Sequence, residues 1–476
     1  MNVANAAESE AQFSQQGQNT FRGRGNQEPI TMLAAYLATL RTFQRNVWLY
    51  FIAISLIGFT VDGGIYSVVF NLFLLRLGYG PEFVGQVNSV GLLAFAICSL
   101  PAGALGSRFG NRQAMIIGLT LMMASSILLS FSEAITTSWR EPWIFTVYCF
   151  FHSSIAIFFV NTAPFLMAST SEDQQSHAFS IQSAMISAAA FVGSMAGGIL
   201  PGIFATTTGL SLEVATPYRY PLLIAGLTIN IGILALFLAQ EKKRNPGKPL
   251  PSRPRRLYPS FFRVPRFNRI QWQNLDRNFL KLVLVVSSIR VFQITGMAVL
   301  MTFFNVYMDD GLGAPTAQVG LLTGLGRLLA VPVVLTMPLL SARWGNRDLS
   351  AGASLSAVLF LLPVAFIPTW WAAGIGYMGV MAGSSIRYTS FLIYIMAMIK
   401  PEQRSLMSGI NEMTAGLGFA VMALIGGYII VNQGYQTLFL LGAGLTFVGT
   451  VIFWGYFRNF AMAKTPLREV AVTEPG

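Results

Sequence analysis

Apolar residues run along this chain in long stretches, separated by short segments that hold most of the charged, Pro and Gly residues. An α-helix of about 20 apolar residues crosses the hydrocarbon core of a bilayer. The pattern therefore predicts an all-α integral membrane protein with twelve transmembrane helices. We place these spans at about 47–76, 82–106, 113–132, 143–169, 177–206, 219–240, 278–308, 316–341, 349–368, 370–399, 405–432 and 436–457.

Landmarks of the first six spans return in the same order in the second six. The tripeptide GNR recurs at an offset of 235 residues, FN at 234, and both a Gln-Ser segment and a Gly pair at 229. The matched segments are GNR at 110–112 and 345–347, FN at 70–71 and 304–305, EDQQS at 172–176 with PEQRS at 401–405, and GG at 197–198 and 426–427. We infer two six-helix pseudo-repeats in parallel orientation, as in transporters whose repeats are related by an axis along the membrane normal.

The distribution of basic residues predicts the topology. With both termini in the cytoplasm, 24 of the 31 Lys and Arg residues lie in cytoplasmic segments and three in the opposite loops, as the positive-inside rule requires. We therefore expect a multi-pass protein of the plasma membrane with cytoplasmic termini. The expected parts are an N-terminal tail (1–45), a first bundle (46–241), a basic linker (242–277), a second bundle (278–458) and a C-terminal tail (459–476).

Composition excludes several classes of function. Charged residues make up 11% of the chain, against about 25% in soluble domains. The net charge of +12 follows from the topology, so we expect no nucleic-acid partner. Two His and two Cys without zinc-ligand spacing, and no phosphate-binding Gly-Lys-Ser/Thr loop, predict no metal and no cofactor. We expect no enzyme, because no nucleophile accompanies His152 and Asp62.

The segment GALGSRFGNRQ at 103–113 lies between spans 2 and 3, and PLLSARWGNRD at 338–348 echoes it between spans 8 and 9. With six plus six spans and a basic linker, these turns make the chain resemble the major facilitator superfamily over about 45–458. Ser107 stands where that family usually has Asp, and Asn111 where it usually has a basic residue. The resemblance implies a monomeric secondary active transporter that works by alternating access, with spans 1, 4, 7 and 10 around its cavity.

The resemblance also implies that these turns lock the two halves together at the cytoplasmic edge. Gly103 and Gly110 would allow a close helix approach and a tight turn. Arg108 and Arg112 would hold carboxylates or the carbonyls at helix C-termini. The alternative is that these arginines only set the topology. The expected gate comprises Gly103, Ser107, Arg108, Gly110, Arg112, Arg343, Gly345 and Arg347.

Each of the four cavity spans carries one ionisable residue near mid-membrane, where a lone charge is costly. These residues are Asp62, His152, Arg290 and Arg387. Burial favours the neutral form of a carboxyl group, so Asp62 is our candidate for proton coupling, alone or as a partner of Arg290. The alternative is a simple hydrogen bond from Asp62 to Thr60 or Tyr66.

A second set of charges lies in the C-terminal half, where Arg327 and Glu412 form an expected buried charge network. We expect Glu412 to pair with Arg387 or Arg327, because a bare buried charge is not tolerated.

We expect the substrate-binding residues to be Arg290, Arg387, His152, Asn161, Gln293, Tyr66 and Tyr388. Three functions fit them. The first is proton-coupled efflux of amphipathic drugs or metabolites. The second is transport of organic anions, because Arg290 and Arg387 suit carboxylates and phosphates. The third is a transport-inactive sensor or receptor. The expected partners are a small-molecule substrate, the lipid bilayer, and protons or another coupling ion.

Overall fold

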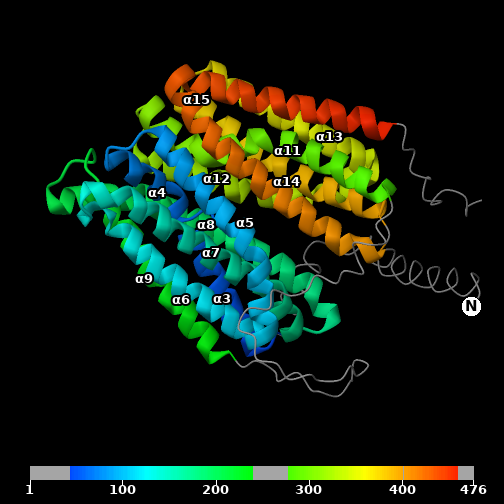
Figure 1. Ribbon diagram of the computed structural model, residues 1–476, viewed down its shortest axis with the longest axis horizontal. Coiled ribbons are helices and arrows are strands. Elements are labelled where there is room, and N and C mark those ends of the chain that lie inside the picture. Colours follow the sequence, from blue (N-terminus) through cyan, green and yellow to red (C-terminus); the bar gives the residue numbers. More distant parts are fainter. Residues whose placement is uncertain (1–42, 240–276, 400, 459–476) are drawn as a thin grey trace, which may run out of the picture.

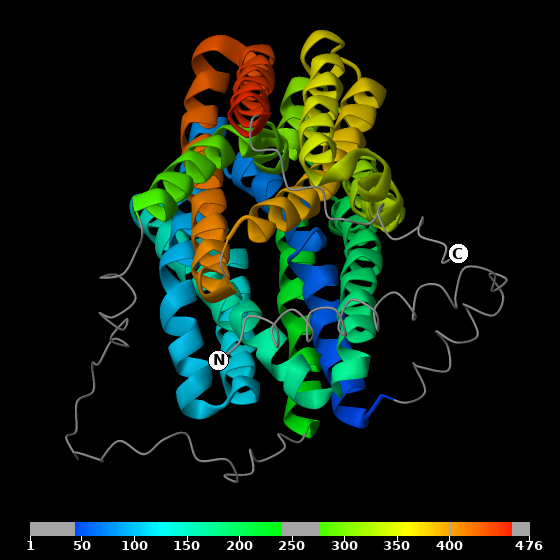
Figure 2. The same ribbon diagram turned by 90° about the vertical axis from the view of Figure 1, so that its right-hand side faces the viewer.

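The computed structural model describes residues 43–239, 277–399 and 401–458. Nearly all of the expected tails and linker lie outside these residues. The described chain folds into helices without a β-strand, as the apolar pattern predicted. Figure 1 shows the helices of the first half, coloured blue to green, beside those of the second half, coloured yellow-green to red. Figure 2 shows the two groups again after a quarter turn.

The first half contains seven long helical segments among the described residues. They are α3 (Arg45–Thr60), α4 (Ile65–Arg76), α5 (Pro81–Phe109), α6 (Asn111–Ser130), α7 (Thr137–Ser169), α8 (Glu172–Thr208) and α9 (Thr216–Leu238). A short 3₁₀ turn, η1 (Ser132–Ala134), precedes α7.

The second half begins with α11 and a π-helical turn. Its elements are α11 (Arg277–Val306), η2 (Tyr307–Gly311), α12 (Thr316–Leu335), α13 (Met337–Phe366), α14 (Trp370–Ala397) and α15 (Pro401–Arg458).

A glycine interrupts α13 and another interrupts α15, and the break in α15 brings the second half to six crossings. Gly345 inside α13 has φ 75° and Gly434 inside α15 has φ 84°, values that glycine adopts without strain. Ten stretches of the described chain are long and apolar enough to cross a membrane. They count Ile410–Arg458 of α15 as one stretch of 49 residues and do not include α14. The arrangement is consistent with the predicted twelve helices.

The first span lies at Arg45–Arg76, close to the predicted 47–76, and it contains a break. The α-helix stops at Thr60 and resumes at Ile65, around Gly63 with φ 85°. The Ser67 hydroxyl accepts a hydrogen bond from the Gly63 N–H at 2.9 Å and donates to the Val61 carbonyl at 2.8 Å. This side chain supplies partners that the interrupted helix lacks, which fixes the break at one place.

The two halves meet mainly where α5 packs on α15 and α8 packs on α12. Small residues make this approach possible. A Cβ atom on Gly198 would lie 3.0 Å from the Gly320 Cα, and one on Gly427 would lie 2.5 Å from the Pro81 carbonyl oxygen. Backbones this close require glycine, as at many helix contacts in membranes.

Polar contacts between the halves gather on one side of the bundle. We call the side where α3 begins and α15 ends the terminal side, and the opposite side the far side. On the far side, Arg76 at the end of α4 forms a bidentate ion pair with Asp309 of η2, at 2.7 and 2.8 Å. Tyr218 and Thr316 lie 3.3 Å apart through their hydroxyls, and the Gln86 amide donates to Tyr428 at 2.7 Å.

The repeated FN dipeptides form a reciprocal contact between the halves, next to these far-side contacts. The Asn71 amide donates to the Thr302 carbonyl at 2.9 Å, and the Asn305 amide donates to the Ser67 carbonyl. Equivalent residues of the two repeats therefore bind the backbone of the opposite half. These contacts close the far side in this structure.

Breaking the far-side ion pair tests this closure. We expect Arg76→Gln and Asp309→Asn each to lower the thermal unfolding temperature of the detergent-solubilised protein. The double variant should lose less than the sum of the two, with a coupling free energy of about 1–2 kcal/mol, because both substitutions remove the same contact. Strictly additive losses would contradict the pairing. The comparison is with Arg219→Gln and Glu133→Gln. Their ion pair lies within the first half, so these variants show the effect of losing an ion pair that does not join the two halves.

Candidate functional site

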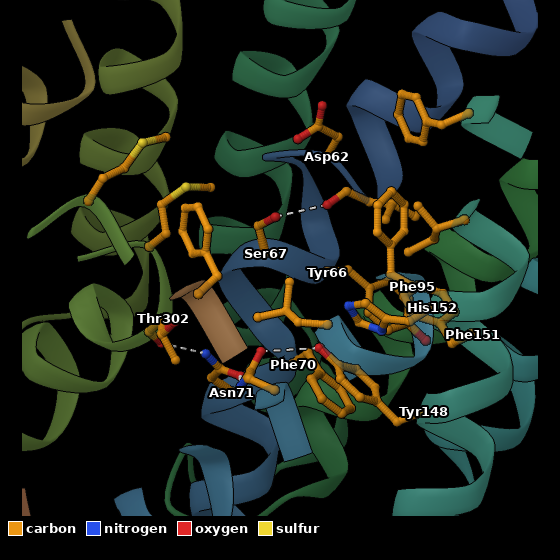
Figure 3. A pocket seen from close by; sticks show the side chains of 18 of the residues that line it. Asp62, Tyr66, Ser67, Phe70, Asn71, Phe95, Tyr148, Phe151, His152 and Thr302 are labelled. Atoms are coloured by element: carbon orange, nitrogen blue, oxygen red, sulfur yellow. Dashed lines mark hydrogen bonds between the residues drawn. The ribbon is translucent and has the colours of Figure 1, made fainter. Parts of the chain in front are cut away.

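A cavity of about 580 Å³ lies between the two halves. Figure 3 shows it from close by. The first half contributes the α3–α4 break and residues of α4, α5 and α7, and the second half contributes residues of α11, α12 and α15. Its wall consists of Val61, Asp62, Tyr66, Ser67, Phe70, Asn71, Asn88, Leu92, Phe95, Tyr148, Phe151, His152, Ile155, Phe159, Met297, Met301, Thr302, Arg327, Glu412 and Phe419.

Stacked aromatic rings form the wall on the side of the first half. Tyr66 and Phe151 stack at 4.8 Å between ring centroids, and Phe70 and Tyr148 stack at 4.6 Å with an interplanar angle of 5°. The imidazole of His152 lies 4.3 Å from the Tyr148 ring. Rings held this way offer a stiff apolar surface to a flat ligand.

A relay of amides connects this aromatic wall to the second half. The Tyr148 hydroxyl donates to Asn88 Oδ1 at 3.2 Å, and Asn88 Nδ2 donates to Asn71 Oδ1 at 3.0 Å. Asn71 in turn donates to the Thr302 carbonyl at 2.9 Å, as Figure 3 shows. The relay places hydrogen-bonding groups along the cavity without placing a net charge there.

One ion pair crosses the cavity. Arg327 Nη2 of α12 lies 3.0 Å from Asp62 Oδ1 at the α3–α4 break, and 37% of the Asp62 side chain is exposed. A Cβ atom on Gly63 would lie 2.8 Å from Arg327 Nε, so glycine leaves the room for the guanidinium group. The expected pairing of Asp62 with Arg290 is therefore corrected, because Arg327 lies against the break in the first span.

Glu412 also differs from expectation. Its carboxylate accepts hydrogen bonds from the Tyr388 hydroxyl at 2.9 Å and from Asn411 Nδ2 at 3.1 Å. The expected ion pair of Glu412 with Arg387 or Arg327 is wrong in this structure, since Arg327 binds Asp62 instead. Neutral donors, not a cation, satisfy the Glu412 oxygen that faces them.

The expected substrate-binding residues fall into two groups. Tyr66 and His152 line the cavity, together with Asp62, Arg327 and Glu412. Outside its wall lie Arg290, Arg387, Asn161, Gln293 and Tyr388. Asn161 donates to the carbonyls of Ala102 at 3.1 Å and Ile157 at 2.8 Å, so it joins two helices of the first half. Arg290 and Arg387 are 2% and 1% exposed.

The cavity also contains residues that the sequence did not single out as a site. Asn71, Asn88 and Tyr148 carry the relay, and Phe70 completes the aromatic wall. The one available signal was the FN repeat, which includes Phe70 and Asn71 and returns in the second half.

The two signature turns take similar forms in the two halves. Gly110 and Gly345 have φ of 96° and 75°, as a tight turn requires. Arg112 donates to the carbonyls of Leu236 at 2.8 Å and Phe237 at 3.0 Å, at the end of α9. Arg347 donates at 3.5 Å to the Phe457 carbonyl, near the end of α15. Each arginine thus binds a helix C-terminus in its own half.

The remaining gate residues make local contacts. Arg108 and Arg343 lie over the rings of the residues that follow them, Phe109 and Trp344, and Ser107 donates to the Ala104 carbonyl. The close approach expected at Gly103 is wrong, because a Cβ there would lie 3.6 Å from its nearest neighbour. It occurs one turn later, at Gly106, where a Cβ would overlap the Asn161 side chain.

Two helical bundles around a shared cavity are the arrangement typical of secondary transporters. The family model of the Major Facilitator Superfamily matches residues 51–384, and a second match covers 286–471. The chain belongs to the Major Facilitator Superfamily. No curated protein matches the chain.

Solved structures share the fold at low sequence identity. The D-xylose-proton symporter has a TM-score of 0.65 and 13% identity, covering 88% of this chain and 97% of that one. The nucleoside transporter NupG has a TM-score of 0.64 and 13% identity, covering 87% and 98%. The xylose transporter XylE from E. coli, in a partially occluded inward open conformation, has a TM-score of 0.62 and 11% identity, covering 87% and 98%.

The amide relay gives a prediction about stability. Asn88→Leu leaves the Tyr148 hydroxyl without its acceptor and the side-chain oxygen Oδ1 of Asn71 without its donor. We therefore expect a loss of about 1–3 kcal/mol in the free energy of unfolding. Adding Tyr148→Phe should cost little more, because the hydroxyl has already lost its acceptor. The measurement is thermal unfolding in detergent, with Asn230→Leu on the exposed face of α9 as control. An equal loss in the control would contradict the relay.

Proposed function

We propose that this transporter couples proton movement to the transport of an amphipathic organic solute by alternating access. The observation that carries the proposal is the Asp62–Arg327 ion pair, which joins the two halves inside the cavity. Asp62 attracts Arg327 only while its carboxyl group is ionised. Protonation removes that attraction and so changes the relative free energies of conformations that keep or break the pair.

The position of the pair suits it to coupling. Asp62 lies at the break between α3 and α4, and Arg327 lies on α12 of the other half. Rocking of the halves moves these elements apart, so the pair has to break during the cycle. A proton bound by Asp62 lowers the cost of that separation, because it leaves a neutral carboxyl in place of an unpaired carboxylate. The fold shared with a D-xylose-proton symporter supports proton coupling.

The cavity wall supports an amphipathic solute. A flat apolar part can stack on the rings of Tyr148 and Phe151, while polar groups reach Asn71 and His152. We propose efflux from a plasma membrane in which both termini are cytoplasmic. Contacts close the far side in this structure, and the proposed topology makes the terminal side cytoplasmic. In efflux, solute would enter the cavity from that side.

The signature turns complete the proposed cycle. Arg112 and Arg347 bind helix C-termini in their own halves while the far side is closed. We propose that the two turns approach each other and lock the terminal side when the far side opens. The alternative function is that of a transport-inactive receptor, which would bind solute without moving it across the membrane.

Proton coupling is tested in proteoliposomes with ethidium, an aromatic probe, under an imposed pH gradient. We expect the gradient to accelerate ethidium transport by the parent at least tenfold. Asp62→Asn should lose the dependence on the gradient and keep ethidium exchange, because its side chain cannot take up a proton.

The control is Glu141→Gln, on an exposed residue near the start of α7. It removes a carboxylate outside the cavity and should behave like the parent. The same gradient dependence in Asp62→Asn as in the parent would remove Asp62 from the coupling mechanism.

The aromatic wall gives a prediction about affinity. Phe151→Leu removes one stacked ring, so we expect ethidium to bind about 2–12-fold more weakly, as the loss of about 0.5–1.5 kcal/mol of aromatic interaction implies. The measurement is ethidium fluorescence titration of the purified protein. Phe237→Leu, on a side chain that is 58% exposed on α9, is the matched control. Equal weakening in both variants would place the probe elsewhere.

A further inference from the structure

Two buried guanidinium groups of the second half have donors without acceptors. Arg290 on α11 is 2% exposed and Arg387 on α14 is 1% exposed. Arg290 Nε and Nη1 and Arg387 Nη1 have no hydrogen-bond partner within the described chain. The Arg290 guanidinium group lies over the ring of Phe391, which is one helical turn after Arg387 on α14, so the two arginines belong to one cluster. Buried cations almost always have a counter-charge, so this cluster lacks a component.

The component that it lacks is a negative charge. Glu412 is the carboxylate whose field acts on Arg290, but it accepts hydrogen bonds from Tyr388 and Asn411. Neither arginine forms an ion pair among the described residues, whose ion pairs involve other arginines. Two positive charges and one negative charge leave one positive charge over. A monoanion would balance the cluster.

The surroundings of Arg290 favour an organic anion over a bare inorganic ion. The guanidinium group lies over the rings of Tyr388 at 5.4 Å and Phe391 at 5.5 Å. Those rings can pack against the apolar body of a ligand while the guanidinium donors take its anionic end. A carboxylate fits such donors, because the planar guanidinium group offers paired N–H groups to two oxygens.

A connection to the cavity exists through Glu412. Glu412 belongs to the cavity wall and accepts its hydrogen bond from Tyr388, whose side chain covers Arg290. Tyr388 is 40% exposed. A ligand carboxylate coming from the cavity would therefore meet the Tyr388–Glu412 contact before it reaches the guanidinium groups.

We propose that Arg290 and Arg387 bind the carboxylate group of a small organic monoanion, and that Glu412 is an internal counter-charge with which this ligand competes. The site is separate from the Asp62–Arg327 pair, and the proposal concerns binding only. It holds or fails independently of proton coupling.

The experiment measures thermal unfolding of the full chain in detergent with sodium benzoate, its neutral analogue benzamide, or sodium phosphate. We expect benzoate to raise the unfolding temperature in a concentration-dependent way, because it binds the native state. Benzamide has the same shape and no charge, and it should have no effect. Stabilisation by phosphate alone, by benzoate and benzamide equally, or by none of the three would overturn the proposal.

Variants separate the roles of the charges. Arg387→Gln should weaken benzoate binding at least tenfold and should raise the unfolding temperature without ligand, because it removes an unpaired buried charge. Glu412→Gln should tighten benzoate binding several-fold, because it removes the competitor. Arg45→Gln changes an exposed arginine by the same charge and should leave the affinity unchanged.

Two results would contradict these roles. Unchanged benzoate affinity in Arg387→Gln would remove the site, and unchanged affinity in Glu412→Gln would remove the competition. Asp62→Asn should bind benzoate like the parent. Loss of proton coupling in that variant together with retained benzoate binding would show that the two activities are independent.

Discussion

The ion pair between Asp62 and Arg327 is the contact on which the arrangement of the cavity depends. A charged side chain at the centre of a bilayer costs about 2.5–3.5 kcal/mol even on lenient insertion scales. The spans of the first half offer no arginine at the depth of Asp62, so its counter-charge comes from the second half. The break between α3 and α4 and the bare backbone of Gly63 give Arg327 its place beside the carboxylate.

The two halves contribute different chemistry to the space between them. Stacked rings and amides come from α4, α5 and α7, whereas methionines and the charges of Arg327 and Glu412 come from α11, α12 and α15. Arg327 and Arg387 illustrate two outcomes for a cation in this setting. Arg327 reaches across the cavity to a carboxylate, while Arg387 stays within its own half without one.

Much of the fold was predictable from the sequence, because apolar length and the repeated landmarks depend on local pattern alone. The spans, the two repeats and the glycine turns at Gly110 and Gly345 follow from that pattern. The partner of Asp62 did not follow, because a contact between helices of different halves depends on their relative rotation. For the same reason, depth along the helix placed Arg290 and Arg387 near mid-membrane without showing that they lie outside the cavity wall.

The reciprocal contact of Asn71 and Asn305 has a consequence for water. Both side chains are buried, with exposures of 8% and 7%, and each donates to a carbonyl of the opposite half. Separation of the halves on this side uncovers two amides and two carbonyls together. Such groups are costly in an apolar medium unless water binds them. Water therefore has to reach the Asn71 and Asn305 contacts when the far side opens, and a dry gap there would be unstable.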